Sequence, residues 1–506
     1  MTVTEPRLDR RPPPLDGSTI PGDDRKPPLV LVANRLPVMR TPAGWRAAPG
    51  GLVSALRPAF DSRRGAWVGW PGSSSGVPST LPGLGARLVP ISLPKKQVEG
   101  HYHGFSNSTL WPLFHGLADR VVINGRWWRE YCDVNLHFAQ RALEVAPPDA
   151  LFWVHDYQLG CVPLQLRRLG ATQPIGFFLH IPFPPQELFA RLPWRNALLD
   201  GLLGADTVSF QTEEYRENFV RACLRLRPDA TADGPVVRLA GGRVVVTATH
   251  PISIDAVALR EQAQSPEVSR ALGRLREQFG ERRVLVGVDR LDYTKGIVER
   301  LRAIELLLER RRDLRSRIAF LQIAVPSRGD IREYRELRSE VEELVGRING
   351  RFTQPGQDVP VHYLYRGVNP TRLLAYYRLA DVCLVTSLRD GMNLVAKEFA
   401  VCQGAGQGRG VLVLSEFAGA AEELREALPC NPFDVEGLAT ILEEALGLDE
   451  DDRRARVERL AKRVADHDVF AWLGEEIDQL ALAHASAGAA DGGQSLIRGT
   501  AGLLAD

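Results

Sequence analysis

The feature that most constrains the fold of this chain is a series of short apolar runs, rich in Val, Ile, Leu and Phe, which recurs along most of its length. The runs are separated by longer segments with helical periodicity. They lie at residues 29–36, 151–157, 175–183, 207–212, 243–252, 283–289, 318–326, 381–387 and 410–415. Because they carry apolar side chains on both faces, they are typical of strands buried on both sides of a parallel sheet.

The intervening segments have the pattern of amphipathic helices. In the segment 331–348, one apolar stripe recurs at helical spacing and is formed by Ile331, Tyr334, Leu337, Val341, Leu344 and Ile348. This stripe predicts a helix that packs on a core. The alternation of strands and helices predicts the α/β class with doubly wound sheets.

The number of apolar runs predicts two domains. An open twisted sheet rarely exceeds about 10 strands, so we expect two Rossmann-like, doubly wound domains that face a cleft. Pro251 interrupts regular structure between two of the runs. We therefore predict an N-terminal domain over 28–252 and a C-terminal domain over 253–467.

The composition limits the class of protein. The 506 residues are 44% hydrophobic and 25% charged, with a formal net charge of +1, so we expect neither nucleic acid nor a membrane surface as a partner. No stretch approaches the roughly 20 apolar residues of a membrane span, and the N-terminus lacks the apolar core of a signal peptide.

The six scattered cysteines indicate reduced thiols in a cytoplasmic protein. Residues 1–27 are predicted to be a disordered tail and residues 486–506 a flexible tail.

Polar side chains follow many of the apolar runs at the same end. In open α/β sheets, ligands bind outside the carboxyl ends of the strands. Any one of these residues could be a loop residue or a helix cap, but together they favour a ligand site. The set consists of Asn34, Arg35, His155, Asp156, His180, Arg290, Lys295, Arg328 and Asp390.

The segment RDGMNLVAKE (389–398) is the strongest local signal. Asp390 and Gly391 predict a turn after a strand, and either Asn393 or Asp390 could cap the helix that follows. The N-terminus of such a helix suits a phosphate. Glu398 is placed to accept hydrogen bonds from sugar hydroxyls, or to pair with a neighbouring arginine as a buried acid.

Two other motifs are weaker. The glycines of Gly50-Gly51 would let the backbone approach a ligand closely. In HYHGFSN (101–107), His101 and His103 have strand spacing, with Tyr102 on the opposite face. Because no carboxylate or cysteine stands near these histidines in the sequence, we expect no metal site there.

Taken in order, ten motifs resemble those of the trehalose-6-phosphate synthases. The resemblance runs from about residue 29 to about residue 475. It implies a retaining glycosyltransferase of the two-domain GT-B type, whose last helix, about 468–485, crosses back to the N-terminal domain. The motifs are ANRLPV, GGLVSAL, FSNSTLWPLFH, WVHDYQL, GFFLHIPFP, VDRLDYTKG, SRGD, GRING, LRDGMNLVAKE and VLSEFAGAA.

The resemblance also implies the site residues. Glucose 6-phosphate would be held by Arg35, Tyr102, Trp111, Asp156 and Arg328. The nucleotide-glucose would be held by Gly50, Gly51, Arg290, Lys295, Val368, Asp390, Gly391, Met392, Asn393, Leu394, Val395 and Glu398. Catalysis would depend on His180, Arg290, Lys295 and Asp390, and the two cations would stabilise the charge of the departing diphosphate. The nucleotide-glucose is then a co-substrate, and neither a metal nor another cofactor is expected.

The activity implied is the transfer of glucose, with retention, from a nucleotide-glucose to glucose 6-phosphate, which gives trehalose 6-phosphate. Val368 stands where related bacterial enzymes carry an aromatic residue against the donor base, so UDP-, ADP- and GDP-glucose all stay open. The alternatives are a glucosylglycerol-phosphate synthase, a glycogen synthase and a catalytically silent regulatory homologue. The family also implies a homo-oligomer, for which we expect a tetramer.

Overall fold

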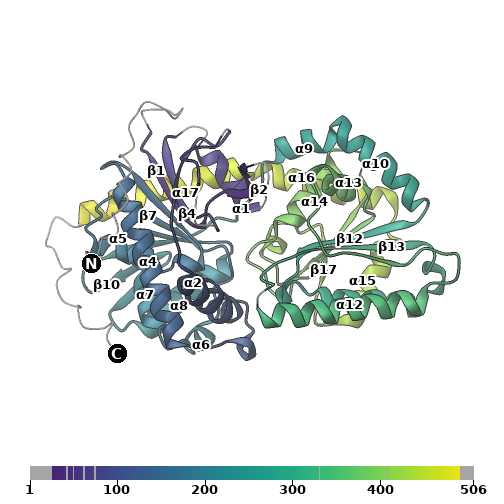
Figure 1. The fold of residues 1–506 in the computed structure, drawn as a ribbon, viewed down its shortest axis with the longest axis horizontal. Helices are drawn as coiled ribbons and strands as arrows, with labels where there is room; N and C mark the ends of the chain where they lie inside the picture. The colour runs from purple at the N-terminus through teal and green to yellow at the C-terminus, as the bar shows by residue number, and fades with distance from the viewer. Residues whose placement is uncertain are drawn as a thin grey trace, which may run out of the picture.

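The structure, a computed structural model, describes residues 26–490 apart from 42–43, 49–50, 61–62, 73–75, 82, 330 and 407, and the side chains of Leu52 and 484–490 are outside the description. Of the predicted tails over 1–27 and 486–506, residues 1–25 and 491–506 lie outside the described residues, and residues 486–490 belong to a helix. The described chain forms two sheets with helices on both faces, and they lie side by side in Figure 1.

The first sheet has nine strands. Its strand order runs outward from β1 in both directions, as in a doubly wound sheet. The strands from β5 to β11 are parallel, and β10 and β9 add an antiparallel edge. In sheet order they are β5 (Arg87–Pro90), β4 (Gly65–Trp70), β1 (Leu29–Arg35), β6 (Leu151–His155), β7 (Ile175–Phe178), β8 (Thr207–Phe210), β11 (Val244–Thr249), β10 (Val236–Leu239) and β9 (Ala230–Asp233). A separate hairpin pairs β2 (Val38–Thr41) with β3 (Gly44–Ala47).

The second sheet has six strands, all parallel. Its central strands are buried along almost their whole length, as the apolar runs predict. In sheet order they are β14 (Val361–Leu364), β13 (Ile318–Val325), β12 (Arg283–Arg290), β15 (Val382–Val385), β16 (Val411–Ser415) and β17 (Leu428–Cys430).

Helices and single turns connect the strands. The α-helices are α1 (Gly51–Leu56), α2 (Lys95–Gln97), α3 (Trp111–Phe114), α4 (Gly125–Val145), α5 (Val162–Arg168), α6 (Gln186–Phe189), α7 (Arg195–Leu202), α8 (Glu213–Leu226), α9 (Ala256–Gln264), α10 (Pro266–Phe279), α11 (Ile297–Arg310), α12 (Arg332–Phe352), α13 (Pro370–Leu379), α14 (Leu394–Gly404), α15 (Val435–Gly447), α16 (Glu450–Asp466) and α17 (Val469–Ala490). The label η marks the other helices. The 3-10 helices are η1 (Arg57–Phe60), η3 (Ala118–Arg120), η4 (Tyr157–Leu159), η5 (Tyr293–Lys295), η6 (Arg312–Leu314) and η7 (Gly419–Glu422), and η2 (Val98–Leu110) is a π-helix.

The predicted α/β class with two facing doubly wound sheets is confirmed. Each of the nine apolar runs contains a strand, and the stripe over 331–348 lies in α12, where its members from Tyr334 to Ile348 are buried. Eight strands were not predicted from the sequence: β2, β3, β4, β5, β9, β10, β14 and β17. These strands are short or lie near a sheet edge, where alternating polar residues hide the apolar pattern.

The strand spacing read into His101 and His103 is wrong, because residues Val98–Leu110 form the π-helix η2. The side chains of Asn107 and Ser108 donate to the carbonyls five residues back, at Tyr102 and His103. Buried polar side chains inside the helix therefore outweigh the strand-like alternation of its sequence.

The two sheets are joined twice. Residues 250–255 run without regular structure from β11 to α9, and α17, yellow in Figure 1, returns to the first sheet, where it contacts β8 and β11. This last helix extends to Ala490, five residues past its predicted end, because its alanine-rich sequence favours helix. His250 Nδ1 lies 2.5 Å from Glu476 Oε1 and fixes α17 to the end of β11.

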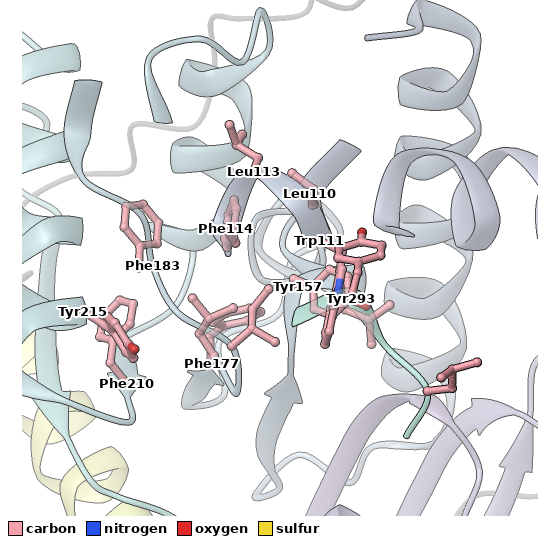
Figure 2. Packing of buried hydrophobic residues seen from close by; sticks show 14 of the residues in the cluster. Leu110, Trp111, Leu113, Phe114, Tyr157, Phe177, Phe183, Phe210, Tyr215 and Tyr293 are labelled. Atoms are coloured by element: carbon pink, nitrogen blue, oxygen red, sulfur yellow. The ribbon is translucent and has the colours of Figure 1, made fainter. Parts of the chain in front are cut away.

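The apolar core continues to the gap between the sheets. In Figure 2, Trp111 and Tyr157 of the first sheet's domain lie beside Tyr293, which belongs to η5 of the second. The ring centroids of Trp111 and Tyr157 are 5.6 Å apart.

The six cysteines are free thiols, and all but Cys132 are buried. No helix among the described residues is long and apolar enough to cross a bilayer.

Candidate active site

A cavity of about 520 Å³ opens between the carboxyl ends of the two sheets. Residues after β1, β6, β7 and β8 form one wall, and residues after β12, β13 and β15 form the other. The strand-end residues that the sequence singled out therefore meet, as the topology of parallel sheets requires.

On the first wall, Arg35 ends β1 and Tyr102 projects from η2. The Arg35 guanidinium carbon lies 4.6 Å from the Trp70 ring centroid, so the side chain is packed in place by a cation–π contact. Burial lowers the pKa of Arg35, although nearby Tyr102 opposes this shift. The Arg35 side chain is exposed at the cavity, and no carboxylate of the described residues is in hydrogen-bond contact with it, so this cation suits an anionic ligand.

Asp156 follows β6 in a strained backbone conformation, with φ of 75°. Its Oδ1 accepts a hydrogen bond of 3.2 Å from the backbone N–H of His180, which ties together the loops after β6 and β7. Burial raises the pKa of Asp156 to about 6, although hydrogen bonds and the cations Arg290 and Arg328 work against this shift. Strain of this kind is typical of functional loops.

Arg328 reaches across the cavity from the loop after β13. Its guanidinium carbon lies 4.0 Å from the Trp111 ring centroid, and its Nη2 donates to the Tyr157 hydroxyl at 3.1 Å. Its Nη1 lies 3.4 Å from Asp292 Oδ2. Burial would raise the pKa of Asp292, but Arg328, Arg290 and Lys295 lower it to about 2. Asp292 is therefore ionised and holds Arg328 in place.

Lys295 and Asp390 form the centre of the second wall. Lys295 Nζ lies 2.5 Å from Asp390 Oδ2, and the same oxygen accepts from Ser387 Oγ and Asn393 Nδ2 at 3.1 Å each. Burial opposes ionisation of Asp390, but Lys295 and Asn393 lower its pKa. The carboxylate is charged and can accept hydrogen bonds from a sugar.

The N-terminus of α14 points into the cavity. Asn393 is its cap, with φ of 98°, and its side chain accepts from Ala396 N at 3.2 Å. Of the two predicted caps, Asn393 is thus the one used. A Cβ on Gly51 would overlap the Leu394 side chain, so the N-termini of α1 and α14 are in close contact. The open N–H groups and the helix dipole favour an anion here.

Glu398 lies one turn into α14, where it is partly buried and lines the cavity. Its carboxylate accepts from the Tyr377 hydroxyl at 3.0 Å, and no arginine pairs with it in the described part of the chain. Burial raises the pKa of Glu398 to about 7, although the Tyr377 hydrogen bond opposes the shift. The alternative prediction, that Glu398 is a buried acid paired with a neighbouring arginine, is therefore wrong.

The two walls touch at Gly391. A Cβ on this glycine would overlap the backbone carbonyl of His180. Close by, the Tyr215 hydroxyl donates to the Asp390 carbonyl at 3.0 Å, and Arg389 pairs with Glu214 at 2.8 Å. The cleft is thus closed around the turn that carries Asp390.

Most predicted site residues line this cavity: Arg35, Gly51, Tyr102, Trp111, Asp156, His180, Arg290, Lys295, Arg328, Asp390, Met392, Asn393, Leu394, Val395 and Glu398. Gly391 lies at the contact between the walls. Val368 is not among the lining residues and packs against the core of the second sheet. Gly50 lies outside the described residues.

The sequence analysis missed three polar residues that support the site. Tyr157 and Asp292 both contact Arg328, and Gln211 lines the cavity after β8. Tyr157 and Asp292 stand inside the motifs WVHDYQL and VDRLDYTKG, and Gln211 ends the run TVSFQT. The position of Gln211 after a predicted strand was a usable signal, as it was for Asn34, but Gln211 was not included among the candidates.

The arrangement can neutralise a diphosphate with Arg290, Lys295 and a helix N-terminus on one wall, and it offers a second anion site at Arg35 and Arg328. Within the described ranges, no group of three His, Cys, Asp or Glu side chains is arranged to hold a metal ion. Two facing Rossmann-like sheets with such a cleft define a nucleotide-sugar glycosyltransferase of the GT-B type.

Comparisons with known proteins identify the family. Residues 28–482 match glycosyltransferase family 20, and the chain belongs to this family. It is 44% identical over 477 residues to a trehalose-6-phosphate synthase of Mycobacterium tuberculosis, which covers 90% of this chain and 95% of the relative. A Mycobacterium avium trehalose-6-phosphate synthase is 45% identical over 472 residues, again with 90% and 95% covered.

Solved structures agree. An α,α-trehalose-phosphate synthase (UDP-forming) of Burkholderia xenovorans, in complex with glucose 6-phosphate, superposes with a TM-score of 0.83 at 35% identity and covers 90% of this chain and 100% of its own. An E. coli structure bound with UDP-2-fluoro glucose gives a TM-score of 0.82 at 34% identity, with 89% and 98% covered. The resemblance to trehalose-6-phosphate synthases and the expected glucosyl transfer to glucose 6-phosphate are confirmed.

Proposed function

We propose that the two walls of the cavity divide the substrates of this transfer. The domain over 28–252 would bind the sugar of glucose 6-phosphate against Tyr102, Trp111 and Asp156. The phosphate would lie between Arg35 of this domain and Arg328, which reaches across from the domain over 253–467. The domain over 253–467 would bind the nucleotide-glucose. The observation that carries the proposal is that four cations, Arg35 and Arg328 together with Arg290 and Lys295, line one cavity between the two sheets.

On the donor side, Arg290, Lys295 and the N-terminus of α14 would hold the diphosphate. Asp390, ionised and fixed by Lys295, would accept hydrogen bonds from the glucose hydroxyls, and Glu398 would accept them from the ribose. As the bond from the anomeric carbon to the phosphate breaks, negative charge grows on the diphosphate. The cations already stand where this charge develops, so they stabilise the transition state more than the bound donor.

His180 would lie beside the reacting sugar, at the point where the walls meet. The closed contact around Gly391 would exclude water from the anomeric carbon and so limit hydrolysis of the donor. We further propose that the enzyme works in the cytoplasm as a homo-oligomer, without a resident cofactor.

The proposal also concerns which nucleotide base the donor carries. Val368, which stands where related bacterial enzymes carry an aromatic residue, is partly buried and packs against the core here. An E. coli relative was solved with UDP-2-fluoro glucose, and this favours uridine as the first base to test.

The test is a measurement of nucleotide diphosphate release with UDP-, ADP- and GDP-glucose, each with and without glucose 6-phosphate. We expect release that depends on glucose 6-phosphate, and a disaccharide phosphate that retains the donor configuration. Glycerol 3-phosphate replaces the acceptor in a parallel assay, because a glucosylglycerol-phosphate synthase would prefer it. Binding of the nucleotide without turnover for any acceptor would instead indicate a silent homologue.

A further inference from the structure

A chain of hydrogen bonds behind the cavity fixes the orientation of one buried amide. The backbone N–H of Ile252 donates to Gln211 Oε1 at 2.9 Å. Because the oxygen of the amide faces this N–H, its Nε2 faces the other way, toward His180 Nδ1 at 3.4 Å. The Gln211 side chain is only 2% exposed, so water does not offer it other partners.

The Ile252 peptide is itself held from both sides. Its carbonyl accepts a hydrogen bond of 2.9 Å from Lys397 Nζ, which comes from α14. Lys397 is buried and pairs with Glu423 at 2.6 Å. The amide of Gln211 is thus oriented by a fixed peptide in the segment between the sheets, and that peptide is tied to the helix that faces the donor.

The amide in turn decides where His180 carries its proton. Gln211 Nε2 can only donate, so His180 Nδ1 must accept. A proton on Nδ1 would place two donors face to face, and turning the amide over would do the same at Ile252. His180 Nε2 lies 3.0 Å from His155 Nδ1. Burial lowers the pKa of His180 to about 3, so the ring is neutral and its single proton lies on Nε2.

We propose that Gln211 is a positioning residue that holds His180 as the neutral tautomer protonated on Nε2. His155 then accepts at Nδ1 and carries its own proton on Nε2, an atom that is buried without a hydrogen-bond partner in the described structure. Both ring nitrogens of His180 are thereby engaged inside the protein.

This inference rests on the proposed function for its consequence. Positive charge grows at the anomeric carbon in glycosyl transfer, and a protonated imidazole beside it would raise the barrier. A neutral ring with its lone pair covered by Gln211 adds no positive charge and cannot remove a proton from the attacking hydroxyl. His180 would therefore shape and desolvate the site rather than act as a base.

The test reads the two ring nitrogens directly. The full-length protein is labelled with ¹⁵N in its histidine rings, and His180 is assigned by the signals lost in His180→Gln. In the wild type without substrates we expect an unprotonated Nδ1 and a protonated Nε2. In Gln211→Glu, the carboxylate accepts from both Ile252 N–H and His180, so the proton should move to Nδ1. Turnover should fall roughly 10-fold to 100-fold, the effect of one charged hydrogen bond, with a smaller change in KM.

Gln403→Glu is the matched control. Gln403 is also 2% exposed, but its amide donates to the carbonyls of Tyr377 and Ala380, away from His180. This variant should leave the His180 nitrogens unmoved. If Gln211→Glu does not fold, Gln211→Leu replaces it, and removal of the donor should give a mixture of both tautomers.

A protonated Nδ1 in the wild type overturns the inference, and so does an unchanged nitrogen pattern in a folded Gln211 variant. Because the nitrogens are read without substrates, this result does not depend on where the sugars bind. If instead the proposed placement of His180 beside the reacting sugar is wrong, His180→Ala will keep near-normal turnover. The nitrogen pattern will then still decide whether Gln211 orients His180.

Discussion

Lys295 Nζ lies 2.5 Å from Asp390 Oδ2, and this ion pair joins the turn after β12 to the turn after β15. The two side chains are 11% and 14% exposed, and Lys295 lowers the pKa of Asp390 against the effect of burial. Arg290, only a few residues before Lys295, is different. Its side chain is 46% exposed, and its nearest carboxylate oxygen, on Asp292, is 3.9 Å away. The same wall of the cleft therefore holds one cation that is already paired with a carboxylate and one that is more open to a ligand.

Arg290→Ala should lose most of its turnover and little of its stability. The Arg290 charge is available to the diphosphate, and loss of one such electrostatic stabiliser costs on the order of 10²–10³ in kcat. Steady-state kinetics and urea unfolding measure the two effects. Arg302→Ala is the control, because that side chain is 50% exposed and pairs on the surface with Glu340. Near-normal rates in Arg290→Ala would show that the donor side is wrongly assigned.

Lys295→Met should lose both turnover and stability. It removes a cation from the diphosphate site and leaves Asp390 buried without its partner, which typically costs about 3–5 kcal/mol. The double variant Lys295→Met, Asp390→Asn should recover much of the unfolding free energy but none of the turnover. A single variant as stable as the wild type would mean that the pair is open to water in solution.

The sequence predicted the cleft better than it predicted the contacts behind it. Arg35, His180, Arg290 and Asp390 were found because charged residues at the ends of apolar runs must gather at one edge of a parallel sheet. Asp292 was not weighed as a site residue, because only the folded chain shows that it holds Arg328. Likewise, β4 and β5 were missed because β4 contains two glycines, GAWVGW, and β5 ends at a proline, RLVP, which weakens the apolar pattern of both segments.

Gly391→Ala should prevent full closure of the cleft. The added methyl group would overlap the His180 carbonyl, which is backbone and cannot move aside as a side chain would. A displacement of about 1 Å at the reacting groups can cost on the order of 10²-fold in rate. Gly346→Ala, in α12 with open space around the new methyl group, should keep its activity. The contrast is measured as kcat for each variant beside its thermal unfolding; equal kcat values would contradict the closed contact as the active state.

The value of kcat/KM for the nucleotide-glucose should fall as the pH is lowered through about 7. Burial raises the pKa of Glu398 to about 7, so its acceptor form, the carboxylate, is lost below this value and gained above it. We therefore expect kcat/KM for the nucleotide-glucose to fall on the acid side, with glucose 6-phosphate kept saturating so that its own titration does not contribute. Glu398→Gln should give a lower, flat profile in this range. If the acid limb persists in Glu398→Gln, another group is responsible.

Trp472→Ala should show that α17 is part of the machinery rather than a terminal appendage. Trp472 is fully buried, and its ring lies 5.3 Å from Trp153, 5.3 Å from Phe178 and 6.4 Å from His180. Removing a buried tryptophan costs about 3–5 kcal/mol, and because this ring backs His180, kcat should fall as well. Phe470→Ala on the same helix is the control, since Phe470 is 49% exposed and its loss should cost no more than about 0.5 kcal/mol. Urea unfolding and kcat are measured for both variants. Should the two cost the same, α17 would not be what holds the floor of the site in place.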